Sequence, residues 1–402
     1  MIERLSKILS HKNILLYGVI SVIILSFKYY LLPLDGDEIK YYELAQNIKY
    51  KGQYFYQDYP NTFIPSIPFL IVLLDIPAYP LLGIFLSRLF VFAMLLVGIY
   101  YAKKVFELSL MDQPVINAIL LGVMFNAQII HWSVVLYPDI IAFGLLWFIL
   151  HRILLYHMSE NITSQNWLIL VLSISILVLV KYVYGVLFLW VVLIWWEKIK
   201  TSCNLIGFTK TFKLYKKHNI AIIIGVLPLI IWLQYLMGVD FGAEANESGF
   251  SQFNSSGENV LVRNIKKGLG IMPMENGRFN GIPAFINNFI PKNHLRDWLT
   301  SVFCLFLVFY GLIFNGIKKP NKINTVLLST LFLVMSAFIL SGTGFSRYWL
   351  PLFPIFYFGI RETLRVFFNK DSVFVYFVFI SIIFYTLNEI RLFQAVFQSL
   401  KS

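Results

Sequence analysis

The sequence has little charge for its length. Charged residues make up 13% of its 402 residues, against roughly 25% in soluble domains. Hydrophobic residues make up 58%, and the mean hydropathy is +0.72. This shortage of charge excludes an ordinary soluble domain and predicts an integral membrane protein.

Cysteine is scarce, and nucleic-acid motifs are missing. Cys203 lies in a basic stretch and Cys304 inside an apolar run, which excludes a disulfide framework. The formal net charge is +12, but no arginine-rich tract or nucleic-acid module accompanies it. In a membrane protein such an excess of Lys and Arg reports topology, so we expect no nucleic-acid partner.

The N-terminal region has the basic start of a signal peptide but lacks its cleavage site. The apolar stretch 14–32 is about long enough to span a bilayer, and no small-residue site precedes Pro33. We therefore expect a first transmembrane helix that is retained.

Apolar segments recur along the whole chain and predict an all-α polytopic membrane protein with about eleven transmembrane helices. No internal repeat is visible, so residues 1–402 are interpreted as a single transmembrane domain. The expected segments are 14–32, 83–102, 115–131, 137–156, 166–180, 182–197, 219–238, 298–315, 325–341, 347–361 and 372–388.

The basic residues decide the orientation. With the N-terminus in the cytoplasm, the short basic connections all fall inside, as the positive-inside rule requires. If the pair of segments that meets at Lys181 were one long helix, the basic connections nearest the C-terminus would lie outside. Two helices with a break at Lys181 are therefore favoured. Two long polar segments then lie outside: 33–82, with interfacial helices, and 239–297, with an amphipathic helix near 260–269.

Three carboxylates follow the first apolar stretch, where charge beside hydrocarbon is costly. Asp35 and Glu38 fit a capping box, with Asp35 as the N-cap of a helix whose apolar positions start at Ile39. Asp37 is left free for chemistry. Capping alone and a catalytic carboxylate in the same turn are both open interpretations.

Other polar residues are expected at the same outer face. They have structural alternatives: Arg88 snorkels or pairs with Asp75, and Asp139 caps a helix. His131 is interpreted as an interfacial residue, and no second His stands at metal-binding spacing. The aromatic residues are ascribed to the lipid interface. The outer set is Asp35, Asp37, Glu38, Arg88, His131, Asp139, Lys181 with Tyr182, and Arg347 with Tyr348.

Carboxylates opposite Lys and Arg at headgroup depth suit a substrate that is a phosphate on a lipid. Cations hold a departing phosphate, while a carboxylate takes the proton from an incoming hydroxyl or amine. Transfer of a sugar from a polyprenyl phosphate has these needs. A flippase or transporter for lipid-linked sugars is the alternative from another class, although transporters place such residues near the bilayer midplane. An oligosaccharide polymerase or ligase is also open.

These residues resemble the first outer loop of GT-C-fold membrane glycosyltransferases. The similar branches are the protein O-mannosyltransferase and aminoarabinose-transferase-like (ArnT/PMT-like) families. The resemblance covers most of residues 1–361. It rests on Asp37-Glu38-x-x-Tyr41-x-x-x-Ala45-x-x-Ile48-x-x-x-Gly52-x-Tyr54, an Arg88-Leu helix, Pro138-Asp139, Lys181 before Gly185, and Arg347-Tyr348-x-x-Pro351.

The resemblance implies an inverting glycosyltransferase of the cell membrane, with its active site on the extracytoplasmic face. Its donor is a sugar on undecaprenyl or dolichyl phosphate, and its acceptor is a lipid, polysaccharide or protein. It implies Asp37 as the catalytic carboxylate and Glu38 as its companion. The residues expected to bind substrate or phosphate are Lys181, Arg347, Tyr348, Asp139 and Arg88.

Two features bear on cofactors and on the phosphate contact. A monophosphate leaving group held by Lys and Arg needs no divalent metal, so we expect no metal and no other cofactor. The aminoarabinose-transferase branch has a Lys before paired prolines in the first outer loop, whereas this chain has Ile64-Pro65-Ser66-Ile67-Pro68. The phosphate contact is therefore expected to rest on Lys181 and Arg347.

The orientation is testable by cysteine labelling in a background with Cys203 and Cys304 replaced by Ser. Cysteines at Asn246 and Asn280 are expected to react with an impermeant maleimide in intact cells, and Lys213→Cys is not. Labelling at position 213 alone would invert the topology and place the site in the cytoplasm.

Overall fold

The computed structural model describes most of the chain. The described residues are 7–30, 32–56, 59–60, 64–77, 79–109, 111–158, 163–206, 215–238, 259–271, 281–286, 289, 298–318, 321–342 and 346–399. The labelling positions Asn246, Asn280 and Lys213, and most of the expected outer loop 239–297, lie outside them.

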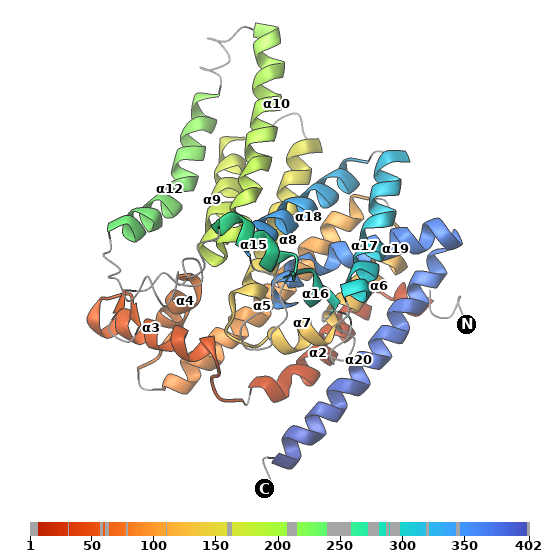
Figure 1. The fold of residues 1–402 in the computed structure, drawn as a ribbon, viewed down its shortest axis with the longest axis horizontal. Coiled ribbons are helices and arrows are strands. Elements are labelled where there is room, and N and C mark those ends of the chain that lie inside the picture. The colour runs from red at the N-terminus through yellow and green to blue at the C-terminus, as the bar shows by residue number, and fades with distance from the viewer. Residues whose placement is uncertain are drawn as a thin grey trace.

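Helices account for nearly all of the described structure (Figure 1). Two-residue strands, β1 (Phe55–Tyr56) and β2 (Tyr59–Pro60), pair antiparallel in the first outer segment. The two 3₁₀ helices are η1 (Tyr182–Leu187) and η5 (Ser346–Leu352). The α-helices are α2 (Ile14–Tyr30), α3 (Asp37–Lys51), α4 (Ser66–Leu74), α5 (Pro80–Glu107), α6 (Gln113–Met124), α7 (Ala127–Trp132), α8 (Pro138–Met158), α9 (Ser164–Val180), α10 (Phe188–Ile206), α12 (Lys216–Gly238), α15 (Val260–Gly268), α16 (Gly281–Phe285), α17 (Trp298–Lys318), α18 (Lys322–Leu340), α19 (Phe353–Phe368) and α20 (Asp371–Ser399).

Each of the eleven expected segments overlaps one or two helices, and the all-α polytopic membrane class is confirmed. Among the described residues, six helices are long and apolar enough to cross a membrane, and four apolar helices are shorter. The third expected segment is divided into α6 and α7, since Phe125 and Asn126 separate them. The number of crossings therefore stays a prediction.

The break at Lys181 is confirmed. Helix α9 ends at Val180, Lys181 is extended with φ −161° and ψ 110°, and the 3₁₀ helix η1 starts at Tyr182. The chain then continues into α10, whose far end projects with the start of α12 at the top of Figure 1, whereas α3 and α4 lie at the lower left.

Glycines bring two pairs of helices into close contact. At Gly98 of α5 a Cβ would overlap the ring of Phe143 in α8, and at Gly144 of α8 it would overlap α5 at Met94. Helices α17 and α19 meet in the same way at Gly311. Small residues of this kind let helix backbones approach in lipid, where association depends on packing. Helices α5 and α8 carry Arg88 and Asp139, so this contact positions the site.

A buried ion pair joins α2 and α20. Lys28 Nζ of α2 lies 2.5 Å from a Glu389 carboxylate oxygen of α20, and both side chains are almost wholly buried. The Tyr29 hydroxyl donates to the same carboxylate at 3.1 Å. The pair satisfies two charges that hydrocarbon would otherwise surround.

The first outer segment packs as a helical unit. Helix α3 lies against α4, and Lys49 of α3 forms an ion pair with Asp75 at the end of α4. The alternative in which Arg88 pairs with Asp75 is therefore wrong. The expected helix forms, and Ala45 of its apolar stripe is buried together with Tyr41 and Leu44, whereas Ile39 is exposed. The expected amphipathic helix near 260–269 is present as α15.

Candidate active site

A glycine turn sets the start of α3. Gly36, not Asp35, is the N-cap, and its φ of +57° lies in the left-handed region that favours glycine. A Cβ at Gly36 would also meet the Tyr137 hydroxyl at 3.1 Å. The predicted N-cap role of Asp35 is therefore wrong. The other half of the expected capping box is present, because the Asp35 N–H donates to the Glu38 carboxylate at 3.3 Å.

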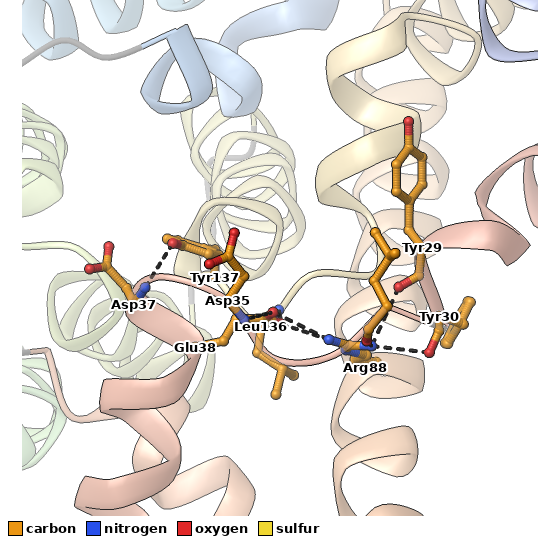
Figure 2. A network of polar contacts seen from close by, with 9 residues as sticks. Tyr29, Tyr30, Asp35, Asp37, Glu38, Arg88, Leu136 and Tyr137 are labelled. Atoms are coloured by element: carbon orange, nitrogen blue, oxygen red, sulfur yellow. Dashed lines mark hydrogen bonds and ion pairs between the residues drawn. The ribbon is translucent and has the colours of Figure 1, made fainter. Parts of the chain in front are cut away.

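Glu38 and Arg88 form a buried structural pair. Arg88 Nη2 lies 3.2 Å from Glu38 Oε2, and both side chains are at most 4% exposed. The Leu136 N–H donates to Glu38 at 2.8 Å. Arg88 Nη1 also donates to backbone carbonyls at the end of α2, including that of Leu32 at 2.9 Å. This pair ties α2, α3, α5 and the chain before α8 together (Figure 2).

Asp37 points away from that pair. In Figure 2 its carboxylate lies on the side remote from Arg88, while its N–H donates to the Tyr137 hydroxyl at 3.1 Å. The Asp37 side chain is 35% exposed, whereas Glu38 is 3% exposed. Neighbouring carboxylates thus have different environments, and Asp37 is the one that a substrate can reach.

Asp139 and Lys181 are joined in the interior. Asp139 lies in the first turn of α8 and is fully buried. Its Oδ1 forms an ion pair with Lys181 Nζ, which is also buried. The alternative in which Asp139 caps the helix is wrong, because Asp139 stands inside α8. A buried carboxylate needs such a partner, since desolvation otherwise disfavours its charge.

Arg347 links this pair to Asp37. Its Nε lies 3.5 Å from Asp139 Oδ2, and its Nη2 lies 3.3 Å from Asp37 Oδ2. Lys181, Asp139, Arg347 and Asp37 therefore form a chain of alternating charges, hereafter the charge chain. It leads from the interior to the half-exposed Asp37. The structure brings these four residues together from η5, the start of α8, the α9–η1 junction and the start of α3. The side of the membrane that they face stays a prediction.

Aromatic rings hold the cations of the charge chain. The Arg347 guanidinium carbon lies 4.2 Å from the centre of the Tyr137 ring and 5.4 Å from that of Trp132. Lys181 Nζ lies 3.3 Å from the centre of the Tyr348 ring. Cation–π contacts of this kind strengthen when water is excluded. Assigning Trp132 and Tyr137 to the lipid interface was wrong, and their place in the short stretch that leads to Asp139 was the sequence signal that they belong to the site.

Burial and charge act on the titration of these groups. Burial lowers the pKa of Lys181 below its ordinary value, and the neighbouring Asp139 acts in the opposite direction. Burial also disfavours the charged form of Arg347, but Asp139, with smaller contributions from Tyr348 and others, raises its pKa above the ordinary arginine value. Burial raises the pKa of Tyr137, so its phenol stays neutral near pH 7.

His131 lies apart from the charge chain. Its ring packs edge-on against Tyr29, with the centroids 4.6 Å apart, and against Trp132 at 4.7 Å. Within the described part of the chain, no group of three or more His, Cys, Asp or Glu side chains is placed to hold a metal ion. Independence of a metal stays a prediction.

The fold is similar to that of a solved membrane glycosyltransferase. ArnT from Cupriavidus metallidurans, in the crystal structure bound to undecaprenyl phosphate, superposes with a TM-score of 0.55 at 13% identity, over 90% of this chain and 61% of that one. Its apo structure gives a TM-score of 0.50 at 13% identity, over 89% and 60%. No family model and no curated protein matches the sequence.

These comparisons confirm an ArnT-like GT-C fold. The chain spans about three fifths of the length of the ArnT chain that it matches. The likeness therefore shows the fold, while the chemistry of this chain has to be argued from its own residues.

Loss of the Glu38 charge is expected to destabilise the protein. Glu38→Gln leaves Arg88 buried without an anionic partner, a change that costs about 3–5 kcal/mol in comparable pairs. The melting temperature of purified protein in lipid nanodiscs is expected to fall clearly, with Asp35→Asn, an exposed neighbour, as the unchanged control. An unaltered melting temperature together with lost transfer would instead place Glu38 in the chemistry.

Proposed function

We propose that this chain is an inverting glycosyltransferase that moves a sugar from a polyprenyl-phosphate carrier to an acceptor at the outer face of the cell membrane. The observation that carries the proposal is the half-exposed carboxylate of Asp37 held against Arg347 at the end of the charge chain. The ArnT-like fold supports it, since the solved ArnT structure holds undecaprenyl phosphate. Residues 1–402 act as one unit in this proposal.

Asp37 is the general base. It takes the proton of the acceptor hydroxyl or amine while the acceptor attacks the anomeric carbon of the donor sugar. The bond from that carbon to the phosphate oxygen breaks on the opposite side, and the phosphate leaves with the electron pair. Attack from the side opposite the leaving group inverts the anomeric centre. The proton ends on Asp37 and the charge on the polyprenyl phosphate.

Arg347 holds the leaving phosphate. Its planar fork binds two oxygens at once, and one nitrogen of that fork contacts Asp37. The donor phosphate takes the place of this carboxylate, which releases Asp37 to act as a base. Catalysis of this kind depends on donors placed beforehand where negative charge develops.

Asp139, Lys181 and Tyr348 keep Arg347 in place. Asp139 contacts Arg347 from the interior, and Lys181 balances the second oxygen of Asp139. Tyr348 lies against both cations. Lys181 is 6% exposed, so we assign it to positioning of Arg347 through Asp139 and leave the direct phosphate contact to Arg347.

Glu38 and Arg88 support Asp37 from the other side. Glu38 binds the backbone of both Asp35 and Leu136, which sets the turn that presents Asp37. Arg88 is committed to Glu38 and to the end of α2. We therefore assign both residues to positioning, although the family resemblance implies substrate roles for them.

Asp37→Asn is expected to abolish transfer without unfolding the protein. Asparagine keeps the size and the hydrogen bonds of the side chain but cannot take a proton, and loss of a general base costs about 10²–10⁴-fold in rate. The test is sugar transfer by purified protein in lipid, with the melting temperature recorded alongside. Asp35→Asn, an exposed carboxylate of the same turn, is the matched control and is expected to stay active. A normally active Asp37→Asn would end the catalytic assignment.

Arg347 is expected to be sensitive even to a conservative change. Arg347→Ala loses a charged contact to phosphate and is expected to lower turnover about 10–100-fold. Arg347→Lys is expected to recover only part, since a point charge replaces a two-pronged contact. The same transfer assay measures both, with Lys370→Gln, which replaces an exposed cation elsewhere, as the control. Wild-type turnover in Arg347→Ala and in Lys181→Ala would remove the charge chain from the mechanism.

A further inference from the structure

A polar pocket lies at the ends of α18 and α19 that are remote from Arg347. It has a volume of about 780 Å³ and is lined from the ends of α17 and α19 and the starts of α18 and α20. Helix α18 has 19 residues, so its two ends are about 28 Å apart at 1.5 Å per residue. Arg347 follows one end of α18, and Asn324 stands at the other. The pocket is therefore separated from the charge chain by about the apolar thickness of a bilayer.

The floor of the pocket is a saturated ion cluster. Arg361 is 5% exposed and binds both carboxylate oxygens of Asp371, at 2.7 and 2.8 Å. Its third donor goes to Glu362, whose other oxygen accepts from Asn315. These four side chains satisfy one another, so they shape the pocket and leave ligand contacts to other residues.

One polar side chain of the pocket makes no hydrogen bond to another described residue. Asn324 lines it and is 9% exposed. Within the described part of the chain, its side-chain amide makes no hydrogen bond. An amide has both donors and an acceptor, and as part of the pocket lining this one is open to a ligand. A ligand hydroxyl, which donates and accepts, matches it.

The mouth of the pocket carries an excess of positive charge. Lys318, Arg365 and Asp112 all line it and are exposed. Among the described residues, none of these three forms an ion pair with another side chain. The charges of the whole lining balance, but Lys318 and Arg365 are the two cations that the carboxylates of the floor do not bind. Exposed cations between helix ends at a membrane surface are suited to phosphate headgroups.

We infer that this pocket binds a phosphodiester that carries hydroxyl groups, with the phosphate on Lys318 and Arg365 and a hydroxyl on Asn324. This is the chemistry of a glycerol-headed phospholipid, and also of a soluble glycerol phosphodiester. The volume lies within the range of small-ligand pockets, about 300–1,000 Å³. The inference does not depend on the proposed glycosyl transfer, because no residue of the charge chain takes part.

The test is lipid binding by the purified full-length protein, measured by native mass spectrometry during titration with phosphatidylglycerol, phosphatidic acid or phosphatidylcholine. Phosphatidylglycerol is expected to bind in preference to phosphatidylcholine. Lys318→Gln/Arg365→Gln is expected to weaken its binding about tenfold or more. Both side chains are exposed, so the fold should tolerate their replacement. Lys370→Gln, an exposed cation that does not line the pocket, is the matched control and should change nothing.

A second variant tests the hydroxyl contact. Asn324→Leu is expected to weaken phosphatidylglycerol binding while leaving that of phosphatidic acid, which has no headgroup hydroxyl, unchanged. Displacement of the lipid by equimolar soluble glycerophosphoglycerol would support the pocket and assign it to a soluble ester. Equal phosphatidylglycerol binding by the double variant and by Lys370→Gln, or no preference over phosphatidylcholine, would overturn the inference.

Discussion

The buried carboxylate of Asp139 is the constraint on which the site depends. A fully buried charge in a membrane protein is tolerated only with partners at hand, and Asp139 has Lys181 on one oxygen and Arg347 facing the other. Because Asp139 needs two cations, η5 and the α9–η1 junction pack beside the start of α8. Arg347 is thereby held at the surface with one side of its guanidinium still directed to Asp37.

The two carboxylates in the first turn of α3 show how one turn serves two purposes. Glu38 is drawn into the interior by Arg88 and by backbone N–H groups, while Asp37, the next residue, stays half-exposed. Helical geometry places successive residues about 100° apart, so one carboxylate anchors the loop while the other faces the substrate side. Gly36, with its positive φ, makes this turn possible beneath the Tyr137 hydroxyl.

Most of the fold was predictable from the sequence because a helix that crosses hydrocarbon has to be long and apolar. Apolar segments of sufficient length and the bias of Lys and Arg predicted where the helices lie, including the break at Lys181. The division of the third segment was missed, because Phe125 and Asn126 interrupt it without a proline or a charge. The exposure of Ile39 in α3 was also not foreseen, since the neighbouring Glu38 is turned inward by Arg88, a residue 50 positions away in the chain.

The sequence by itself determined that the chain is a polytopic helical membrane protein and that acidic and basic residues gather at one face. Those conclusions follow from composition, length and charge bias, which are local properties. The partner of each charge was decided only by tertiary structure: Asp139 by Lys181 and Arg347, and Glu38 by Arg88. Ion pairs form between residues far apart in the chain, and their geometry depends on how closely the helices pack. Glycine contacts such as Gly98 against Phe143 set that packing, and no pattern along the chain reveals which helix lies opposite.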